Sequence, residues 1–124
     1  MLELHQFRHS AFCLKVRMVL QAKGLSYRTV EVTPGIGQVA VFQLSGQRQV
    51  PVLVDDDTVL ADSSVIARHL EKREPTPALI PDDPRQASQV HLIEDWADTT
   101  LSTAVRKALI QAAALDHELR VALL

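Results

Sequence analysis

The sequence opens with a strand that turns sharply into a helix, and this feature constrains the fold most. Residues 2–7 alternate between apolar and polar side chains, which is typical of a strand with one buried face. Residues 11–23 then carry apolar side chains at helical spacing, and Gly24 is suited to end that helix. Ser10 and the only cysteine, Cys13, stand at its first turn. Such a helix start presents unpaired N–H groups and partial positive charge, so it is a place to hold an anion or a thiolate.

A second strand, a short helix, a hairpin and a third helix follow. Residues 27–32 alternate and are rich in β-branched residues, and residues 38–44 are compatible with a short helix. Residues 50–54 and 58–61 flank a turn of three aspartates, which predicts an antiparallel hairpin. Capping residues then open a helix that ends at about residue 73. The order β-α-β-α-β-β-α predicts a mixed four-stranded sheet, in which the first crossover makes a parallel pair.

A stiff, proline-rich segment separates this α/β part from the remaining helices. Residues 74–84 contain four of the six prolines. Two helical patterns then run to the end of the chain, and the second ends in an apolar run without a cap. We therefore expect an α/β domain over residues 1–75, a linker over residues 76–83 and a partial all-α domain over residues 84–124. The apolar face of the last helix needs a partner, and formation of a homodimer would supply one.

Composition argues against several classes of function. The formal net charge is −2 and no basic cluster stands out, so we expect no nucleic-acid partner. A single cysteine rules out an internal disulfide or a multi-cysteine metal site, and the five histidines include no pair at metal-ligand spacing, so we expect no metal. No apolar run approaches the length of a membrane span and no signal-peptide pattern is present, which favours a cytoplasmic protein without a membrane partner.

These elements, in this order, resemble the glutathione transferase family, whose fold is a thioredoxin-like domain followed by an all-helical domain. The resemblance covers residues 2 to about 107. Each matching segment alone is weak, but their order and spacing together are fairly specific. The segments are the active-site turn and first helix (10–17), the loop before the hairpin (49–53), the acidic-serine pair that opens the third helix (62–63), and part of the helix after the linker (94–96).

The resemblance implies a role for several residues. Ser10 matches the serine that hydrogen-bonds the glutathione sulfur, where a hydroxyl and a helix start favour the nucleophilic thiolate over the thiol. Val50 precedes Pro51, which the resemblance implies is cis, and the backbone of Val50 would pair with the cysteinyl part of glutathione. Ser63 matches the residue that binds the γ-glutamyl carboxylate, and Asp62 matches the acidic neighbour of the γ-glutamyl amine.

Further residues have more than one interpretation. Phe12 is expected among the glutathione contacts, and Gln49 lies near the expected position of the glycyl carboxylate. Cys13 occupies the second position of a C-x-x-C pattern whose first position is a serine here, which argues against dithiol chemistry. Cys13 is either a small residue packed in the helix or, if exposed, a thiol with a lowered pKa and a second catalytic candidate. Lys15 and Arg17 are interpreted as solvated or paired surface charges.

The function implied by the resemblance is a glutathione transferase that acts in detoxification. Glutathione, as co-substrate, would supply a thiolate that attacks an electrophilic small molecule. The alternative is a non-catalytic glutathione-binding or assembly module, because the helical part that supplies the electrophile pocket in the family is short here. A third possibility is a thiol reductase that uses Cys13. Ser10 also has a purely structural interpretation, as the N-cap of the first helix.

Overall fold

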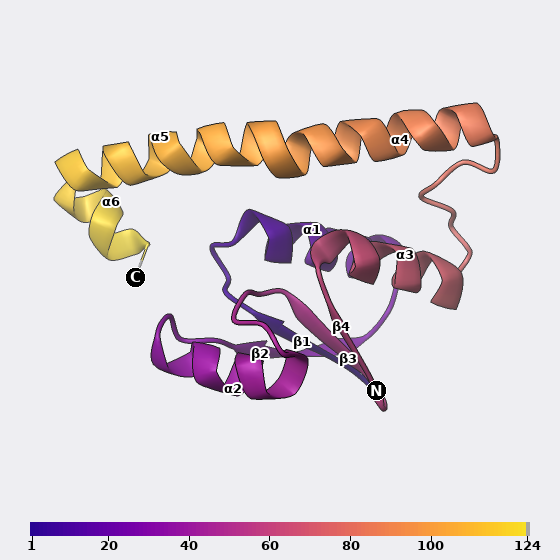
Figure 1. Ribbon diagram of the computed structural model, residues 1–124, viewed down its shortest axis with the longest axis horizontal. Helices are drawn as coiled ribbons and strands as arrows, with labels where there is room; N and C mark the ends of the chain where they lie inside the picture. The colour runs from indigo at the N-terminus through magenta and orange to yellow at the C-terminus, as the bar shows by residue number, and fades with distance from the viewer. Residues whose placement is uncertain (124) are drawn as a thin grey trace. The chain divides into compact units, whose positions relative to one another are not determined.

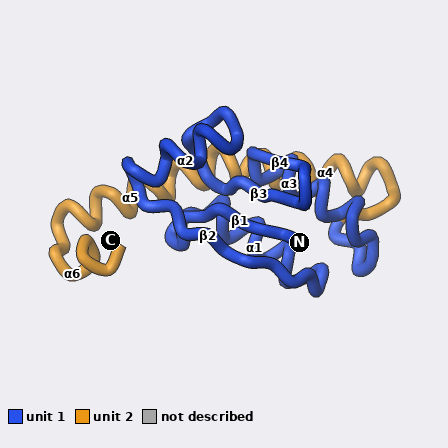
Figure 2. The backbone as a smooth tube through the Cα atoms, turned by 90° about the horizontal axis from the view of Figure 1, so that it is seen from below, with its two compact units in different colours: residues 1–79 blue, residues 80–124 orange. Residues whose placement is uncertain are grey.

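The computed structural model describes residues 1–123, and the chain divides into two compact units, residues 1–79 and residues 80–124 (Figure 2). The first unit is an α/β structure with one mixed sheet in the strand order β2-β1-β3-β4. Its elements are β1 (Leu2–Gln6), α1 (Ala11–Ala22), β2 (Tyr27–Glu31), α2 (Ile36–Ser45), β3 (Val52–Asp55), β4 (Thr58–Ala61) and α3 (Ser63–Arg73). β1 runs parallel to β2 and antiparallel to β3, and β3 and β4 form a hairpin. The predicted mixed four-stranded sheet is therefore confirmed.

Helices cover both faces of this sheet, with α1 and α3 on one face and α2 on the other (Figure 1). The larger apolar cluster lies under α1 and α3 and consists of Leu2, Leu4, Val16, Leu20, Leu53, Ile66 and Leu70. The smaller cluster joins α2 to the opposite face and contains Val32, Val41 and Val52. The neighbours Val52 and Leu53 belong to different clusters because successive side chains of a strand point to opposite faces.

The ends of the predicted elements differ from the observed ones by a few residues. α2 begins at Ile36 rather than at residue 38, and β3 begins at Val52 rather than at residue 50. Gly24, predicted to end α1, follows the C-cap residue and has a φ of 66°, a conformation that glycine adopts without steric cost. The Val50–Pro51 peptide bond is cis, as the resemblance implied, and Thr76–Pro77 is also cis.

The second unit is helical, and one prediction about it is wrong. The sequence predicted two helical patterns, but α4 (Pro84–Trp96), the π-helical turn η1 (Ala97–Leu101) and α5 (Ser102–Leu115) form one continuous helix (Figure 1). A π-turn holds an extra residue and rotates the side chains that follow, so the apolar pattern shifts without a break in the backbone. The break comes at Asp116, which caps α6 (His117–Ala122) by accepting from the N–H of Leu119 at 3.0 Å.

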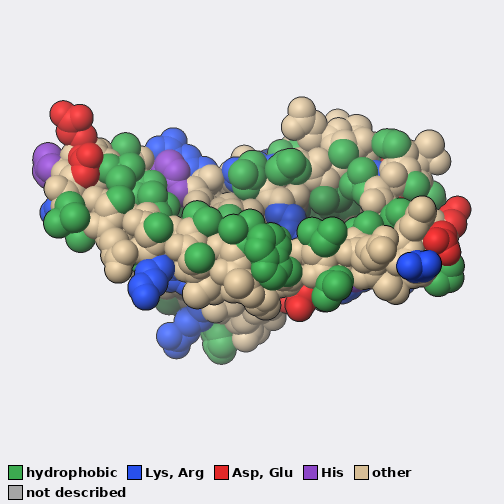
Figure 3. All heavy atoms as spheres, turned by 90° about the horizontal axis from the view of Figure 1, so that it is seen from above, with side chains coloured by type: hydrophobic (Ala, Val, Ile, Leu, Met, Phe, Trp, Pro, Cys, Tyr) green, Lys and Arg blue, Asp and Glu red, His purple; other side chains and the backbone are tan. Residues whose placement is uncertain are grey.

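Many large apolar side chains of the second unit are exposed. Figure 3 shows several patches of hydrophobic side chains, in green, on the face that it presents. Those of the second unit that are exposed are Leu92, Ile93, Trp96, Leu101, Val105, Leu109, Ile110, Leu115 and Val121. Leu124, the end of the predicted apolar run, lies outside the described residues. None of the helices in residues 1–123 combines the length and apolar character needed to cross a membrane.

A buried ion pair fixes the segment that follows α3. The ammonium group of Lys23, whose side chain has no exposed surface, lies 2.7 Å from the carboxylate of Glu71. The same ammonium donates to the carbonyl oxygen of Pro77 at 2.5 Å, and the N–H of Leu79 donates to Glu71 at 2.9 Å. These contacts hold the first part of the predicted linker against α1 and α3.

A second charged cluster makes the stability of the first unit depend on pH. Asp55, at the end of β3, is nearly buried, pairs with Arg73, and lies 2.7 Å from Nε2 of His69. The hydrogen bond from Arg73 is the main cause that holds the pKa of Asp55 below its usual value, and the bond to His69 adds to it. Because the folded-state pKa is the lower one, this stabilisation is complete above the unfolded pKa of about 3.9 and is lost as the pH falls through the folded value.

We expect replacement of Asp55 with asparagine to lower the melting temperature at neutral pH, and to lower it progressively less as the pH falls below the unfolded pKa of about 3.9. As the wild-type carboxyl becomes protonated at low pH, it loses the charged interactions that the asparagine variant already lacks. Thermal melts followed by circular dichroism across this pH range measure the difference. The matched control is Asp57→Asn in the adjoining turn, whose side chain is exposed. A melting difference between Asp55→Asn and wild type that stays constant with pH contradicts the prediction.

Candidate functional site

Three segments that are far apart in the sequence meet at one edge of the sheet. β1 pairs with β3 so that His5 lies opposite Val52, and β3 pairs with β4 so that Val52 lies opposite Ala61. The end of β1, the start of β3 and the end of β4 are therefore neighbours. β1 leads into the turn that carries Ser10, β3 follows the cis Pro51, and β4 leads directly into α3. The sheet thus gathers two helix starts and the cis-proline loop at the same edge.

Ser10 is the N-cap of α1. Its backbone is extended, with φ of −77° and ψ of 128°, and its hydroxyl oxygen accepts from the N–H of Cys13 at 3.4 Å. The N–H of Ser10 donates to the carbonyl oxygen of Phe7 at 2.9 Å, which closes the turn after β1. A serine hydroxyl donates one hydrogen bond and accepts two. The cap uses only its oxygen, so the hydroxyl hydrogen can donate to a further atom.

The side chain of Arg17 braces the turn that carries Ser10. Nη1 donates to Oε1 of Gln6 at 2.5 Å, and Nη2 donates to the carbonyl oxygen of Arg8 at 3.2 Å. The backbone N–H of Arg8 donates in turn to the carboxylate of Glu31 at 3.0 Å. Arg17 therefore donates to neutral oxygens within the turn and at the end of β1.

Cys13 lies inside the core and is 0% exposed. Burial is the main cause that raises the pKa of its thiol, and it outweighs the hydrogen bonds with Phe7 and Ser10 that act in the opposite direction. A thiolate is the reactive form of cysteine, and an inaccessible thiol with a raised pKa is a poor nucleophile. The burial and the pKa direction both support the packing interpretation of this residue.

Asp62 and Ser63 form the start of α3. Oδ1 of Asp62 accepts from the N–H of Ser64 at 2.8 Å and from the N–H of Val65 at 3.3 Å. The predicted capping role of Asp62 is thus confirmed. Asp62 has a φ of 76°, a conformation that costs a non-glycine residue about 1–3 kcal/mol and that clusters at functional sites. Ser63 is the first residue of the helix and is 6% exposed.

Lys15 connects the two helix starts and was missed by the sequence analysis as a site residue. Its ammonium donates to the hydroxyl oxygen of Ser63 at 3.2 Å and to that of Ser64 at 3.0 Å. The contact joins residues 48 positions apart. The one available signal was the position of Lys15 within the first turns of α1, near a helix start already suspected of holding an anion.

The remaining expected glutathione contacts differ in their exposure. Pro51 is buried and Val50 is half-buried, and both belong to the loop at the edge that gathers the helix starts. Phe12, the second residue of α1, is half-buried. Gln49 is exposed, and its side chain forms no hydrogen bond within residues 1–123. The structure therefore brings the segments of Ser10, Pro51 and Ser63 together and leaves Gln49 at the surface.

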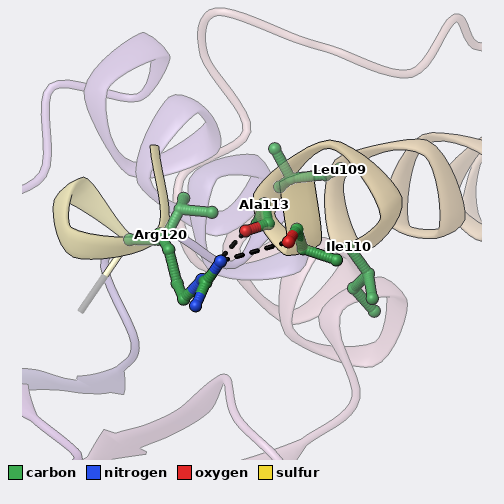
Figure 4. Close-up of a pocket in the computed structure, with 6 residues that line it drawn as sticks. Leu109, Ile110, Ala113 and Arg120 are labelled. Atoms are coloured by element: carbon green, nitrogen blue, oxygen red, sulfur yellow. Dashed lines mark hydrogen bonds between the residues drawn. The ribbon is translucent and has the colours of Figure 1, made fainter. Parts of the chain in front are cut away.

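A separate apolar hollow lies within the second unit, between α5 and α6 (Figure 4). It has a volume of about 310 Å³ and is lined by Leu109, Ile110, Ala113, Ala114, Arg120 and Leu123. The guanidinium of Arg120 donates to the carbonyl oxygens of Ala113 and Ala114 at 3.0 and 3.1 Å. It thereby caps carbonyl groups at the carboxyl end of α5. Within residues 1–123 no group of three or more His, Cys, Asp and Glu side chains is placed to hold a metal ion.

The sheet, the cis-proline loop and the two helix starts define a thioredoxin-like fold with a polar site at one edge of the sheet. A family model described as the glutathione S-transferase N-terminal domain matches residues 4–83. The chain belongs to the glutathione S-transferase family. The match covers all of the first unit except its first residues, and it includes Ser10, Pro51 and Ser63.

The relatives and solved structures that the chain matches carry different names. It is 34% identical over 90 residues to the stringent starvation protein A homolog of Pasteurella multocida, covering 68% of this chain and 42% of the relative. It is 32% identical over 97 residues to the maleylacetoacetate isomerase of Mus musculus, covering 74% and 45%. A theta class glutathione S-transferase of Xanthomonas axonopodis pv. citri, solved with glutathione bound, superposes with a TM-score of 0.77 at 26% identity, covering 87% and 53%. The chain spans about half the length of the curated relatives it matches.

Proposed function

We propose that the chain binds glutathione at the first unit and activates its thiol for attack on an electrophilic small molecule. The observation that carries this proposal is the meeting of Ser10, the cis Val50–Pro51 bond and the start of α3 at one sheet edge. The family membership and the glutathione bound to a solved relative support the choice of ligand. Glutathione serves as a co-substrate in this proposal, and the electrophile accepts its sulfur.

Each part of glutathione has a chemically suited group in the proposed site. The γ-glutamyl carboxylate lies at the start of α3, where Ser63 donates its hydroxyl hydrogen. The γ-glutamyl ammonium pairs with Oδ2 of Asp62, because the capping bonds of that carboxylate use Oδ1. The backbone of Val50 pairs with the cysteinyl residue. Phe12 borders the sulfur end, and Gln49 offers an exposed amide to the glycyl carboxylate.

Ser10 acts at the sulfur in the proposed reaction. Its hydroxyl hydrogen donates to the glutathione sulfur, and the start of α1 adds favourable electrostatic potential. Both effects stabilise the thiolate, so the thiol releases its proton to solvent near neutral pH. The thiolate then attacks the electrophilic carbon, a C–S bond forms, and the leaving group departs with the bonding electron pair.

We propose the domain bounds, the location and the oligomeric state on the basis of the family membership. Residues 1–75 form the glutathione-binding domain, and residues 84–124 contribute a partial helical domain joined to it by the linker over residues 76–83. A cytoplasmic homodimer that acts in detoxification fits this assignment. The support for self-association is the set of exposed apolar side chains on the helical unit, since large apolar patches mark interaction surfaces.

One observation favours a second function, a glutathione-binding or assembly module without catalysis. The hollow of the helical unit is lined by aliphatic groups and one arginine that is engaged with the backbone of α5, so it offers little to orient an electrophile. The third candidate, a thiol reductase that uses Cys13, needs an accessible thiol, and the burial of Cys13 weighs against it.

Retention on immobilised glutathione tests the first step of the proposed function. We expect the purified chain to be retained and to elute with free glutathione. We also expect it to accelerate conjugation of glutathione with a simple aryl halide above the uncatalysed rate. Cysteinylglycine, which lacks the γ-glutamyl group, should elute the protein poorly because it cannot reach α3. Retention without conjugation favours the binding module, and passage of the folded protein without retention contradicts the proposal.

A further inference from the structure

Lys15 is placed to control which chemical group binds at the start of α3. Its side chain crosses from α1 to α3. Its ammonium donates to the hydroxyl oxygen of Ser63 at 3.2 Å and to the hydroxyl oxygen of Ser64 at 3.0 Å. The Lys15 residue is half-buried, and its partner Ser63 is only 6% exposed. The contact between them is therefore largely shielded from solvent. An ammonium held in such surroundings is screened less than one on the open surface.

The ammonium decides how the Ser63 hydroxyl can bond. Lysine only donates hydrogen bonds, so the oxygen of Ser63 must act as the acceptor in this contact. The hydroxyl hydrogen is not used in this contact, and within residues 1–123 the structure records no acceptor for it. A nearly buried hydroxyl with an unused hydrogen at a helix start is suited to donate to an anion.

The ammonium of Lys15 and the carboxylate of Asp62 both bond to groups at the start of α3. Asp62 places a carboxylate at the same helix start, where it accepts from two backbone N–H groups. An unopposed carboxylate there would repel a second carboxylate from a ligand. The ammonium on Ser63 and Ser64 is the opposite charge that lets the two carboxylates share the helix start.

We propose that Lys15 is the positioning residue that makes this helix start selective for a ligand carboxylate. It orients the Ser63 hydroxyl as a donor and supplies the positive charge that the γ-glutamyl carboxylate of glutathione requires. This inference rests on the proposed function and deepens it, because glutathione is its ligand. It assigns carboxylate selectivity to a side chain of α1, although the carboxylate itself binds at α3.

The test compares glutathione with an analogue whose γ-glutamyl α-carboxylate is converted to the amide. Isothermal titration calorimetry measures both ligands against wild type, Lys15→Met and Lys15→Arg. We expect Lys15→Met to bind glutathione about 10- to 100-fold more weakly than wild type, since a hydrogen-bond network to a charged group is lost. The affinity of the amide should change little. Lys15→Arg, which keeps the charge and donors, should recover most of the affinity for glutathione.

Lys72→Met is the matched control, because Lys72 is an exposed lysine in the last turn of α3, and it should bind both ligands as wild type does. If Lys15→Met does not fold, Lys15→Gln keeps a donor without the charge and should show the same selective loss. Equal weakening of glutathione and amide overturns the inference, and so does an unchanged affinity for glutathione. Wild type that binds neither ligand overturns the proposed function itself. If wild type binds glutathione, the proposed ligand stands, and the variants then test the role of Lys15 alone.

Discussion

Replacement of Ser10 with alanine is expected to lower kcat/KM for glutathione conjugation about 100-fold and to leave the affinity for glutathione nearly unchanged. Loss of one preorganised donor to a developing or full negative charge typically costs a factor of about 100 to 1,000 in rate. The hydroxyl meets only the sulfur, so the groups that bind the rest of glutathione remain. Steady-state kinetics with saturating glutathione, together with calorimetric binding, separate the two quantities.

The pH dependence distinguishes the proposed role of Ser10 from its capping role. Loss of the cap alone destabilises the helix by about 1 kcal/mol, which a thermal melt detects, but it leaves the pKa of bound glutathione in place. Without the hydroxyl, the thiol should ionise at higher pH, so the rate of Ser10→Ala should recover as the pH rises. Ser10→Thr keeps both cap and donor and serves as the control. Wild-type kinetics in a folded Ser10→Ala protein would remove Ser10 from the mechanism.

Replacement of Ser63 with alanine is expected to raise the Kd for glutathione about 30-fold and to change kcat little at saturation. Ser63 is nearly buried, so its hydrogen bond to a carboxylate is charge-assisted and water does not readily replace it. Ser88→Ala is the matched control, since Ser88 is exposed and its hydroxyl bonds the backbone of its own helix. A loss of kcat with unchanged KM would place Ser63 at the reacting sulfur instead of at the carboxylate.

Ser63 and Lys15 act on the same carboxylate, so their substitutions should not be additive. Residues that share one hydrogen-bond network typically couple by about 0.5–3 kcal/mol in double-mutant cycles. The Ser63→Ala, Lys15→Met pair should therefore lose less affinity for glutathione than the two single losses combined. Full additivity would mean that the 3.2 Å contact between them carries no functional coupling.

The parts of the fold that local patterns determine were predictable. Alternation marks β1, the aspartate turn marks the β3–β4 hairpin, and the Asp62 cap marks the start of α3, because each depends on neighbouring residues only. The continuity of α4 and α5 was not predicted. The π-helical turn shifts the apolar pattern along the helix. When a regular helical period is assumed, such a shift resembles the end of one helix and the start of another.

The site shows the same division between local and tertiary information. Ser10 and Ser63 stand at helix starts that their own sequence neighbourhoods define. The role of Lys15 depends on how α1 packs against α3, through buried residues such as Val16 and Ile66, and no local pattern reports that packing. The burial of Cys13 is likewise set by tertiary contacts, although the residue lies in a helix first turn that would otherwise lower the pKa of a thiol.

The decisive measurement is a crystal structure of this chain with glutathione bound. We expect the glutathione sulfur within hydrogen-bond distance of Oγ of Ser10, the cysteinyl backbone against Val50, and the γ-glutamyl carboxylate between Ser63 and Lys15. A sulfur that lies against another side chain, or a glutathione molecule bound away from this sheet edge, would rule out the proposed site.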